Sequence, residues 1–318
     1  MIHIMKCLII PGADSFECHE DRLHLAQFDL ALFFVKKAEK ILFEHGINLE
    51  LESFLTEPNQ NTNEWFIKLA IVTVPLHKAI YEIYKQTQGH PDIILSCSLG
   101  DISRNAIFEI CSFEDSVLGM HLFAQNVVKI KSGESYIVKS NVEFQSNKFE
   151  SLKKYSVHLG IEQTKKQLML CGKLENINDW ATSELQSNYR IFPLYPFPLH
   201  CILMKSCSDQ LKIFLNSKNI NSSPIKVFSA LSLKFIDEKQ SFRDEINTNI
   251  IDAVLWSKAI KKLSVMYPQI EFVNLGASTA MLKFAEKSAE TEHVFLDFFS
   301  YSVKMGYFLK KAKNAVNF

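Results

Sequence analysis

One stretch between residues 92 and 101 constrains the fold of this chain more than any other. Residues 93–96 have the apolar character of a short buried strand, and a turn of small residues follows them. A helix is expected to begin at about Leu99. The order of strand, tight turn and helix is typical of α/β proteins, where such a turn can hold a serine, here Ser98, at the end of a sheet.

The turn has the pattern S-x-S-x-G. In a nucleophile elbow the residues two before and two after the serine must be small, because the backbone passes close to them, and Ser96 and Gly100 meet this need. The usual pattern begins with Gly, so Ser96 is a small departure. The following helix would aim backbone N–H groups and its positive dipole end at Ser98. The alternative is that the segment is only a turn, since short motifs also match by chance.

Composition excludes several classes of protein. The 318 residues suffice for one large domain or two smaller ones, and the 25 phenylalanines indicate an aromatic core. The 35 basic and 35 acidic residues cancel and no basic stripe occurs, so we expect no nucleic-acid partner. The apolar run at residues 30–35 is too short to span a bilayer, and residues 1–7 lack the pattern of a secretory signal, so we expect no membrane partner.

The cysteines indicate a reducing compartment. Their number, seven, is odd and no C-x-x-C pair occurs, so we expect a reduced, cytoplasmic protein without a metal site. We also expect it to be a monomer.

Helical and strand patterns alternate along most of the chain. The apolar run before Pro11-Gly12 predicts a buried first strand. Helices are expected at residues 21–45, 63–88, 99–111, 199–215 and 250–266, and further strands at residues 225–229 and 270–275. This alternation predicts an α/β sheet with parallel strands.

Between residues 127 and 191 the pattern changes. Strands are expected at residues 127–130, 135–138 and 167–170, and helices at residues 149–155 and 178–186. Short strands interleaved with two helices predict a small α+β subdomain inserted into the larger one.

Six segments stand in the order in which one enzyme family carries its motifs. Pro11-Gly12 stands where that family has P-G-Q-G-S-Q, and S-C-S-L-G-D at residues 96–101 stands where it has G-H-S-L-G-E. S-F-E-D-S-V at residues 112–117 matches S-F-E-D-A-V. The remaining segments, at residues 167–172, 199–204 and 273–276, resemble its Q-V-V-I-S-G strand, its F-H-S-P-L-M and its strand ending in G-P. Over about residues 9–282 the chain thus resembles the malonyl-CoA:acyl-carrier-protein transacylases and the related acyltransferases of polyketide assembly lines.

The resemblance implies a fold. We expect an α/β-hydrolase-like large domain with a parallel sheet, made of residues 1–125 and 198–318. A small ferredoxin-like subdomain, residues 126–197, would be inserted into it.

The resemblance also implies a chemistry. His200 would be the base that removes the proton of Ser98, which then carries the acyl group between thioesters. The oxyanion donors would be the backbone N–H groups of Leu99 and Ala13, which do not depend on the side chain. No cofactor is expected, because coenzyme A or the phosphopantetheine of an acyl carrier protein carries the substrate. The alternative for His200 is a buried structural histidine.

The departures from the family pattern concern the substrate. Malonyl-transferring members hold the substrate carboxylate with an arginine that aligns with Phe123, and no arginine lies between Arg104 and Arg190. A carboxylate beside Phe123 would be costly to bury without a partner. We therefore expect an uncharged acyl group, with Arg104 of the elbow helix as the alternative cation if malonyl is used.

Two further departures lie near the predicted base and nucleophile. Before Trp256 the family often has a polar residue that orients the base, and here it is Leu255. His200 would then need a backbone carbonyl or another residue to fix its tautomer. Cys97 replaces the elbow histidine and is expected to pack rather than react, because the elbow exposes only its middle residue. We expect Phe123, Leu255 and Cys97 to line the substrate pocket.

Three functions remain open. The first is an acyltransferase that acts on acyl-carrier-protein or coenzyme A thioesters, for a non-carboxylated acyl group, in biosynthesis of the polyketide or fatty-acid type. The second is a trans-acting acyl hydrolase that releases acyl groups from carrier proteins. The third is a non-catalytic homologue that only binds a carrier protein.

Overall fold

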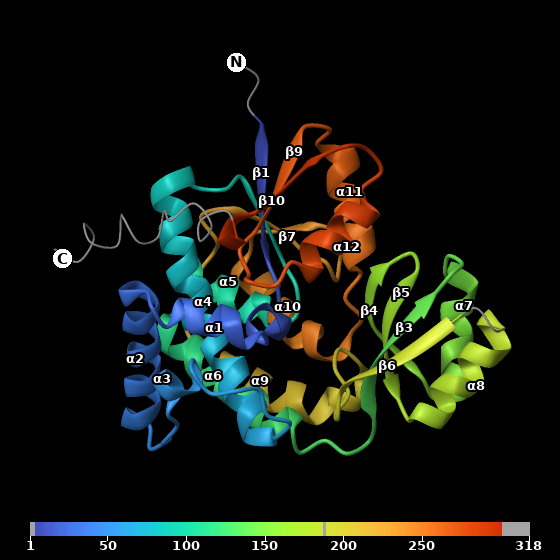
Figure 1. Cartoon of the computed structure of the whole chain (residues 1–318), viewed down its shortest axis with the longest axis horizontal. Helices are drawn as coiled ribbons and strands as arrows, with labels where there is room; N and C mark the ends of the chain where they lie inside the picture. Colours follow the sequence, from blue (N-terminus) through green and yellow to red (C-terminus); the bar gives the residue numbers. More distant parts are fainter. Residues whose placement is uncertain (1–3, 187–188, 301–318) are drawn as a thin grey trace.

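A six-stranded sheet organises the larger part of the molecule (Figure 1). The computed structural model describes residues 4–186 and 189–300. The strand order is β10-β9-β1-β2-β7-β8, and all neighbours are parallel except β7 and β8. The strands are β1 (Met5–Ile10), β2 (Ile93–Ser96), β7 (Lys226–Phe228), β8 (Phe235–Ile236), β9 (Ile270–Asn274) and β10 (Val294–Asp297). The central strand β2 is buried along its whole length, which explains its continuous apolar character.

Helices cover this sheet, and α12 packs against β9 and β10 while α4 contacts α2, α5 and α6. They are α1 (His19–Leu25), α2 (Asp29–Glu44), α3 (Leu51–Phe54), α4 (Asn63–Gln88), α5 (Gly100–Ile107), α6 (Phe113–Val127), α9 (Lys205–Asn216), α10 (Lys239–Ile251), α11 (Trp256–Met266) and α12 (Ala280–Ser288), with 3₁₀ turns η1 (Ala13–Phe16) and η3 (Ile202–Met204). Ser112 caps α6 by accepting a hydrogen bond from the Asp115 N–H at 2.9 Å. Within the described ranges no helix has the length and apolar character needed to cross a membrane.

The smaller part is built on a four-stranded antiparallel sheet in the order β4-β5-β3-β6. Its elements are β3 (Glu134–Ser140), α7 (Ser146–Ser151), η2 (Leu152–Tyr155), β4 (His158–Thr164), β5 (Gln167–Gly172), α8 (Leu174–Leu185) and β6 (Tyr189–Tyr195). The succession βαββαβ with this strand order is the ferredoxin-like arrangement that the sequence predicts. It has its own apolar core around Trp180. The domain limits at residues 126 and 197 stay a prediction.

Several segments differ from their predicted structure, and at residues 127–130 a helix contains the apolar residues expected for a strand. Residues 127–130 are not a strand: α6 runs to Val127, and Val127 and Val128 are buried at its end. Residues 21–45 form two helices, α1 and α2, rather than one.

The segment at residues 250–266 is also not one helix. Helix α10 ends at Ile251 and α11 begins at Trp256, and the residues between them are not helical. Val254 donates a hydrogen bond to the Gly160 carbonyl and accepts one from the Glu162 N–H, both at 2.9 Å. The helix is interrupted because this linker attaches strand β4 of the small sheet to the large part, a contact that local periodicity cannot reveal.

Candidate active site

Ser98 lies on the sharp turn between β2 and α5. Its φ of +59° is left-handed, a conformation that side chains other than glycine adopt rarely and often at functional sites. Gly100 permits the turn, since a Cβ there would lie 2.1 Å from the Ile10 carbonyl oxygen. A Cβ on Gly12 would lie 3.0 Å from the Ser98 Cβ. The first loop therefore lies directly against the elbow.

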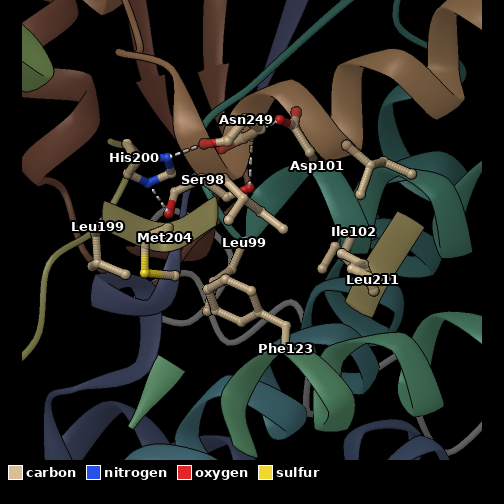
Figure 2. A pocket seen from close by; sticks show the side chains of 12 residues that line it. Ser98, Leu99, Asp101, Ile102, Phe123, Leu199, His200, Met204, Leu211 and Asn249 are labelled. Carbon is tan, nitrogen blue, oxygen red and sulfur yellow. Dashed lines mark hydrogen bonds between the residues drawn. The ribbon is translucent and has the colours of Figure 1, made fainter. Parts of the chain in front are cut away.

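His200 lies beside Ser98, although they are distant in sequence. Its Nε2 is 2.8 Å from the Ser98 Oγ, and its Nδ1 is 2.6 Å from the backbone oxygen of Asn249 (Figure 2). Because a carbonyl only accepts hydrogen bonds, Nδ1 carries the proton and Nε2 accepts from the serine hydroxyl. Burial lowers the pKa of His200, and the bond to Asn249 opposes that shift. The neutral imidazole is thus placed to take the serine proton.

Asn249 and Asp101 complete this network, and sequence analysis did not identify either. The Asn249 side-chain amide donates to the Asp101 carboxylate and to the Ser98 carbonyl, the latter at 3.4 Å. The Asp101 carboxylate also accepts from the Ser96 hydroxyl and from the Arg104 guanidinium, the latter at 3.0 Å. The elbow helix α5 is therefore tied to α10, which supplies the acceptor for His200. Asp101 ends the S-C-S-L-G-D motif, but nothing in the local sequence marks Asn249.

Arg104 has a structural place in this network. Its side chain is fully buried, is paired with Asp101 and lies over the Phe242 ring at 5.5 Å. It lines neither the cleft of about 210 Å³ nor the smaller space of about 20 Å³ that adjoin Ser98. It is therefore not positioned to pair with a substrate carboxylate.

The two predicted oxyanion donors lie in the same cleft as Ser98. Leu99 is the N-terminal cap residue of the elbow helix α5, Ala13 opens η1, and both residues line that cleft. Among the residues that the structure describes, neither N–H donates to another protein group. The loop of Ala13 is held in place, because the Ser15 hydroxyl donates to the Gly12 carbonyl at 2.6 Å and Arg22 donates to two further loop carbonyls at 2.9 Å.

A cleft of about 210 Å³ opens at Ser98 between the large and small parts. It is lined by Gly12, Ala13, Asp14, Phe66, Cys97, Ser98, Leu99, Phe123, Ile137, Ile161, Gln163, Gln167, Met169, Leu194, Tyr195, Leu199, His200, Ala280, Met281 and Phe284. Of the residues that line the cleft, Asp14 alone belongs to the charged types Asp, Glu, Lys and Arg. Burial, and then the nearby Glu17, raise the pKa of Asp14 to about 7. The cleft therefore offers a bound thioester mostly apolar walls and no lysine or arginine.

A second, smaller space of about 20 Å³ adjoins Ser98 inside the large part. It is lined by Ser98, Leu99, Asp101, Ile102, Phe123, Leu199, His200, Met204, Leu211, Ile246, Asn249 and Ile250, and Figure 2 shows these side chains.

The predicted pocket residues have different positions. Phe123 lines both spaces, and Cys97 lines the cleft while remaining buried. Burial raises the pKa of the Cys97 thiol well above its usual range, which does not favour a nucleophilic thiolate. Leu255 lines neither space: it precedes α11, and its N–H donates to the Ala230 carbonyl at 2.9 Å. The prediction that Leu255 lines the pocket is therefore wrong.

Comparison with known proteins supports the fold. No protein-family model matches the chain. A malonyl CoA-acyl carrier protein transacylase of Haemophilus influenzae is 24% identical over 195 residues, which cover 58% of this chain and 62% of the relative. The match thus spans less than two thirds of that relative.

Solved structures match over nearly the whole chain. The malonyl CoA-acyl carrier protein transacylase of Coxiella burnetii has a TM-score of 0.79 at 16% identity and covers 95% of this chain and 99% of its own. An acyl carrier protein S-malonyltransferase of Vibrio cholerae has a TM-score of 0.78 at 16% identity, covering 92% and 96%. A malonyl-transacylase in complex with its type II polyketide acyl-carrier protein has a TM-score of 0.81 at 14% identity, covering 95% and 99%. The fold of this chain is the one these structures share.

Proposed function

Because the chain is a distant relative of the malonyl-CoA:acyl-carrier-protein transacylases, we propose that it is an acyltransferase that works through an acyl-Ser98 intermediate. Its substrates would be thioesters of coenzyme A and of an acyl carrier protein, the partner present in one of the similar structures. The observation that carries the proposal is the chain of contacts from the Ser98 Oγ to His200 Nε2 at 2.8 Å and from His200 Nδ1 to the Asn249 carbonyl at 2.6 Å.

The geometry supports a two-step transfer. As the Ser98 Oγ attacks the thioester carbonyl carbon, His200 Nε2 takes the hydroxyl proton and the oxyanion points to the N–H groups of Leu99 and Ala13. The carbon–sulfur bond then breaks, and the leaving thiolate takes the proton from His200. An acceptor thiol attacks acyl-Ser98 by the same steps in reverse. One oxyanion donor contributes about 3 kcal/mol to lowering such a barrier.

The acyl group would be uncharged. By the family resemblance Phe123 aligns with the arginine that holds a carboxylate. In the structure Arg104 is paired with Asp101, and Asp14 supplies the carboxyl group of the cleft lining. A malonyl carboxylate would lose hydration here without an ion-pair partner, at a cost of several kcal/mol. An apolar chain would instead gain about 0.8 kcal/mol per buried CH₂.

Intact-mass spectrometry tests the proposal. Wild-type protein mixed with acetyl-CoA should gain one acetyl group, and Ser98→Ala should gain none. His200→Ala should slow the gain by about 10²-fold to 10⁴-fold. Cys97→Ser, a change at the neighbouring residue, is the matched control and should still be acylated.

The same experiment separates the alternatives. Transfer of the acetyl group to added holo-carrier protein supports the transferase. Release of free acetate without an acceptor would instead favour a hydrolase, since transfer and hydrolysis share acyl-Ser98. If no thioester produces an adduct on the wild type, the acyltransferase proposal fails and a carrier-binding homologue becomes the better explanation.

A further inference from the structure

Two spaces of very different size meet at Ser98. The cleft measures about 210 Å³ and the inner pocket about 20 Å³. The residues that line both are Ser98, Leu99, Phe123, Leu199 and His200. In Figure 2 the Phe123 ring is drawn below the elbow, with Met204 to one side and Ile102 and Leu211 to the other. Phe123 therefore forms part of the partition between the two spaces.

The inner pocket suits a small apolar group. Beyond the shared residues its lining is mostly aliphatic, from Ile102, Met204, Leu211, Ile246 and Ile250. Its polar neighbours Asp101 and Asn249 are bonded to each other, so they have little capacity left for a ligand. A volume of about 20 Å³ is close to the room that one water-sized group needs. The end of a short acyl chain would fit, and a longer chain would not.

The cleft suits a different part of the substrate. Its roughly 210 Å³ exceed the approximately 150 Å³ of a cavity that holds benzene. It lies between the large and small parts, with walls from β4, β5, β6 and α12. A thioester needs room for its carrier arm as well as its acyl chain, and of these two spaces the cleft has room for the arm. With the arm in the cleft, the acyl chain is left to the inner pocket.

We propose that Ser98 accepts short apolar acyl groups, acetyl and propionyl, whose terminal carbon enters the inner pocket, and that the Phe123 ring sets the upper limit of chain length. This inference rests on the proposed acyl-Ser98 chemistry. It adds a limit on the length of the acyl chain to the proposal that the acyl group is uncharged.

A ladder of coenzyme A thioesters tests the limit, with acetyl, propionyl, butyryl, hexanoyl and octanoyl members. The rate of acyl-Ser98 formation, followed by intact mass, should fall at least about tenfold between propionyl and hexanoyl on the wild type. Phe123→Ala should remove most of this fall, because it joins the pocket to the cleft. Phe123→Leu keeps an apolar residue in the core and should remove part of the fall in rate. This second variant preserves the test if Phe123→Ala does not fold.

Phe284→Ala is the matched control. Phe284 lines the cleft but not the inner pocket, so its replacement should leave the ratio of octanoyl to acetyl rates unchanged. A wild type that loads octanoyl as readily as acetyl would overturn the size limit, as would a Phe123→Leu protein with the wild-type chain-length profile. Both results include an acyl adduct, so they are distinct from failure of the proposed function, in which no adduct forms at all.

Discussion

The two sides of Ser98 differ in how their polar groups are satisfied. Toward α10, His200, Asn249 and Asp101 form a continuous chain of hydrogen bonds that ends on a buried arginine. Toward α6 and α12 the walls are apolar, and Asp14 supplies the one carboxyl group of the cleft lining. The side that would move protons is a continuous hydrogen-bonded chain from Ser98 to Arg104, whereas the side that would meet the acyl group offers it no lysine or arginine.

The difference has a physical basis. Removing one member of the buried network, such as Asp101, would leave the Arg104 charge buried without its partner, which typically costs about 3–5 kcal/mol. Exchanging one apolar wall residue for another of similar volume usually costs less than about 1.5 kcal/mol. The proton-transfer side is therefore strongly constrained, while the substrate side can change its specificity at little cost in stability. The predictions below test whether the two sides are as separate as this implies.

The largest expected effect comes from restoring a cation on the apolar side. We expect wild-type protein to acylate Ser98 at least tenfold faster with acetyl-CoA than with malonyl-CoA, a difference of about 1.4 kcal/mol. Phe123→Arg should shift this ratio by about 10-fold to 100-fold toward malonyl, because a guanidinium can hold the carboxylate in a bidentate pair. The measurement is the rate of adduct formation by intact mass.

Phe123→Leu separates charge from size in this experiment. It opens the partition without adding a cation, so the preference for acetyl over malonyl should persist. If wild-type protein loads malonyl as readily as acetyl, the argument from Phe123 is wrong, and another group must hold the carboxylate.

A smaller effect is expected from removing the side-chain hydrogen bonds of Asn249 on the side that faces α10. Asn249→Ala keeps the backbone carbonyl that accepts from His200 but removes the amide bonds to Asp101 and Ser98. The acylation rate should fall about tenfold, because small displacements of catalytic groups are costly. The ratio of acetyl to malonyl rates should stay unchanged.

Asn247→Ala on the same helix is the matched control, since the Asn247 carbonyl accepts from the Ser208 hydroxyl and, within residues 4–186 and 189–300, Asn247 makes no hydrogen bond to the elbow. Equal losses in Asn247→Ala and Asn249→Ala would mean that the tether to α5 contributes nothing specific. A changed substrate ratio in Asn249→Ala would show that the two sides of Ser98 are not independent.

The sequence predicted the elements whose signals are local. A buried apolar run, small residues at fixed spacing and a helix start define the elbow between β2 and α5, and the structure has them at those positions. The parallel sheet and a small inserted α+β subdomain followed from alternating patterns, which are visible because they depend on residues close together in the chain. The ferredoxin-like form of the insertion was implied by the family resemblance.

The features that the sequence did not reveal depend on distant contacts. Asn249 lies in the middle of an ordinary helical pattern, and its role is apparent only when α10 is packed beside α5. The break before Trp256 exists because Val254 pairs with β4. Leu255 was assigned to the pocket from its place in a motif, but its backbone bond to Ala230 holds it outside both spaces.

The smallest expected effect concerns Asp14 and pH. The pKa of Asp14 is raised from 3.8 to about 7, so its carboxyl is mostly neutral below pH 7 and charged above it. The charged form repels a malonyl carboxylate, and the ratio of malonyl to acetyl rates should therefore fall about threefold to tenfold as pH rises from about 6 to 8, the size expected for two partly screened like charges. Burial lowers the pKa of His200, which favours its neutral form, and the base acts on both substrates in the same way. Asp14→Asn should make the ratio independent of pH, at the value that wild-type protein has near pH 6. A pH-dependent ratio that persists in Asp14→Asn would assign the repulsion to another group.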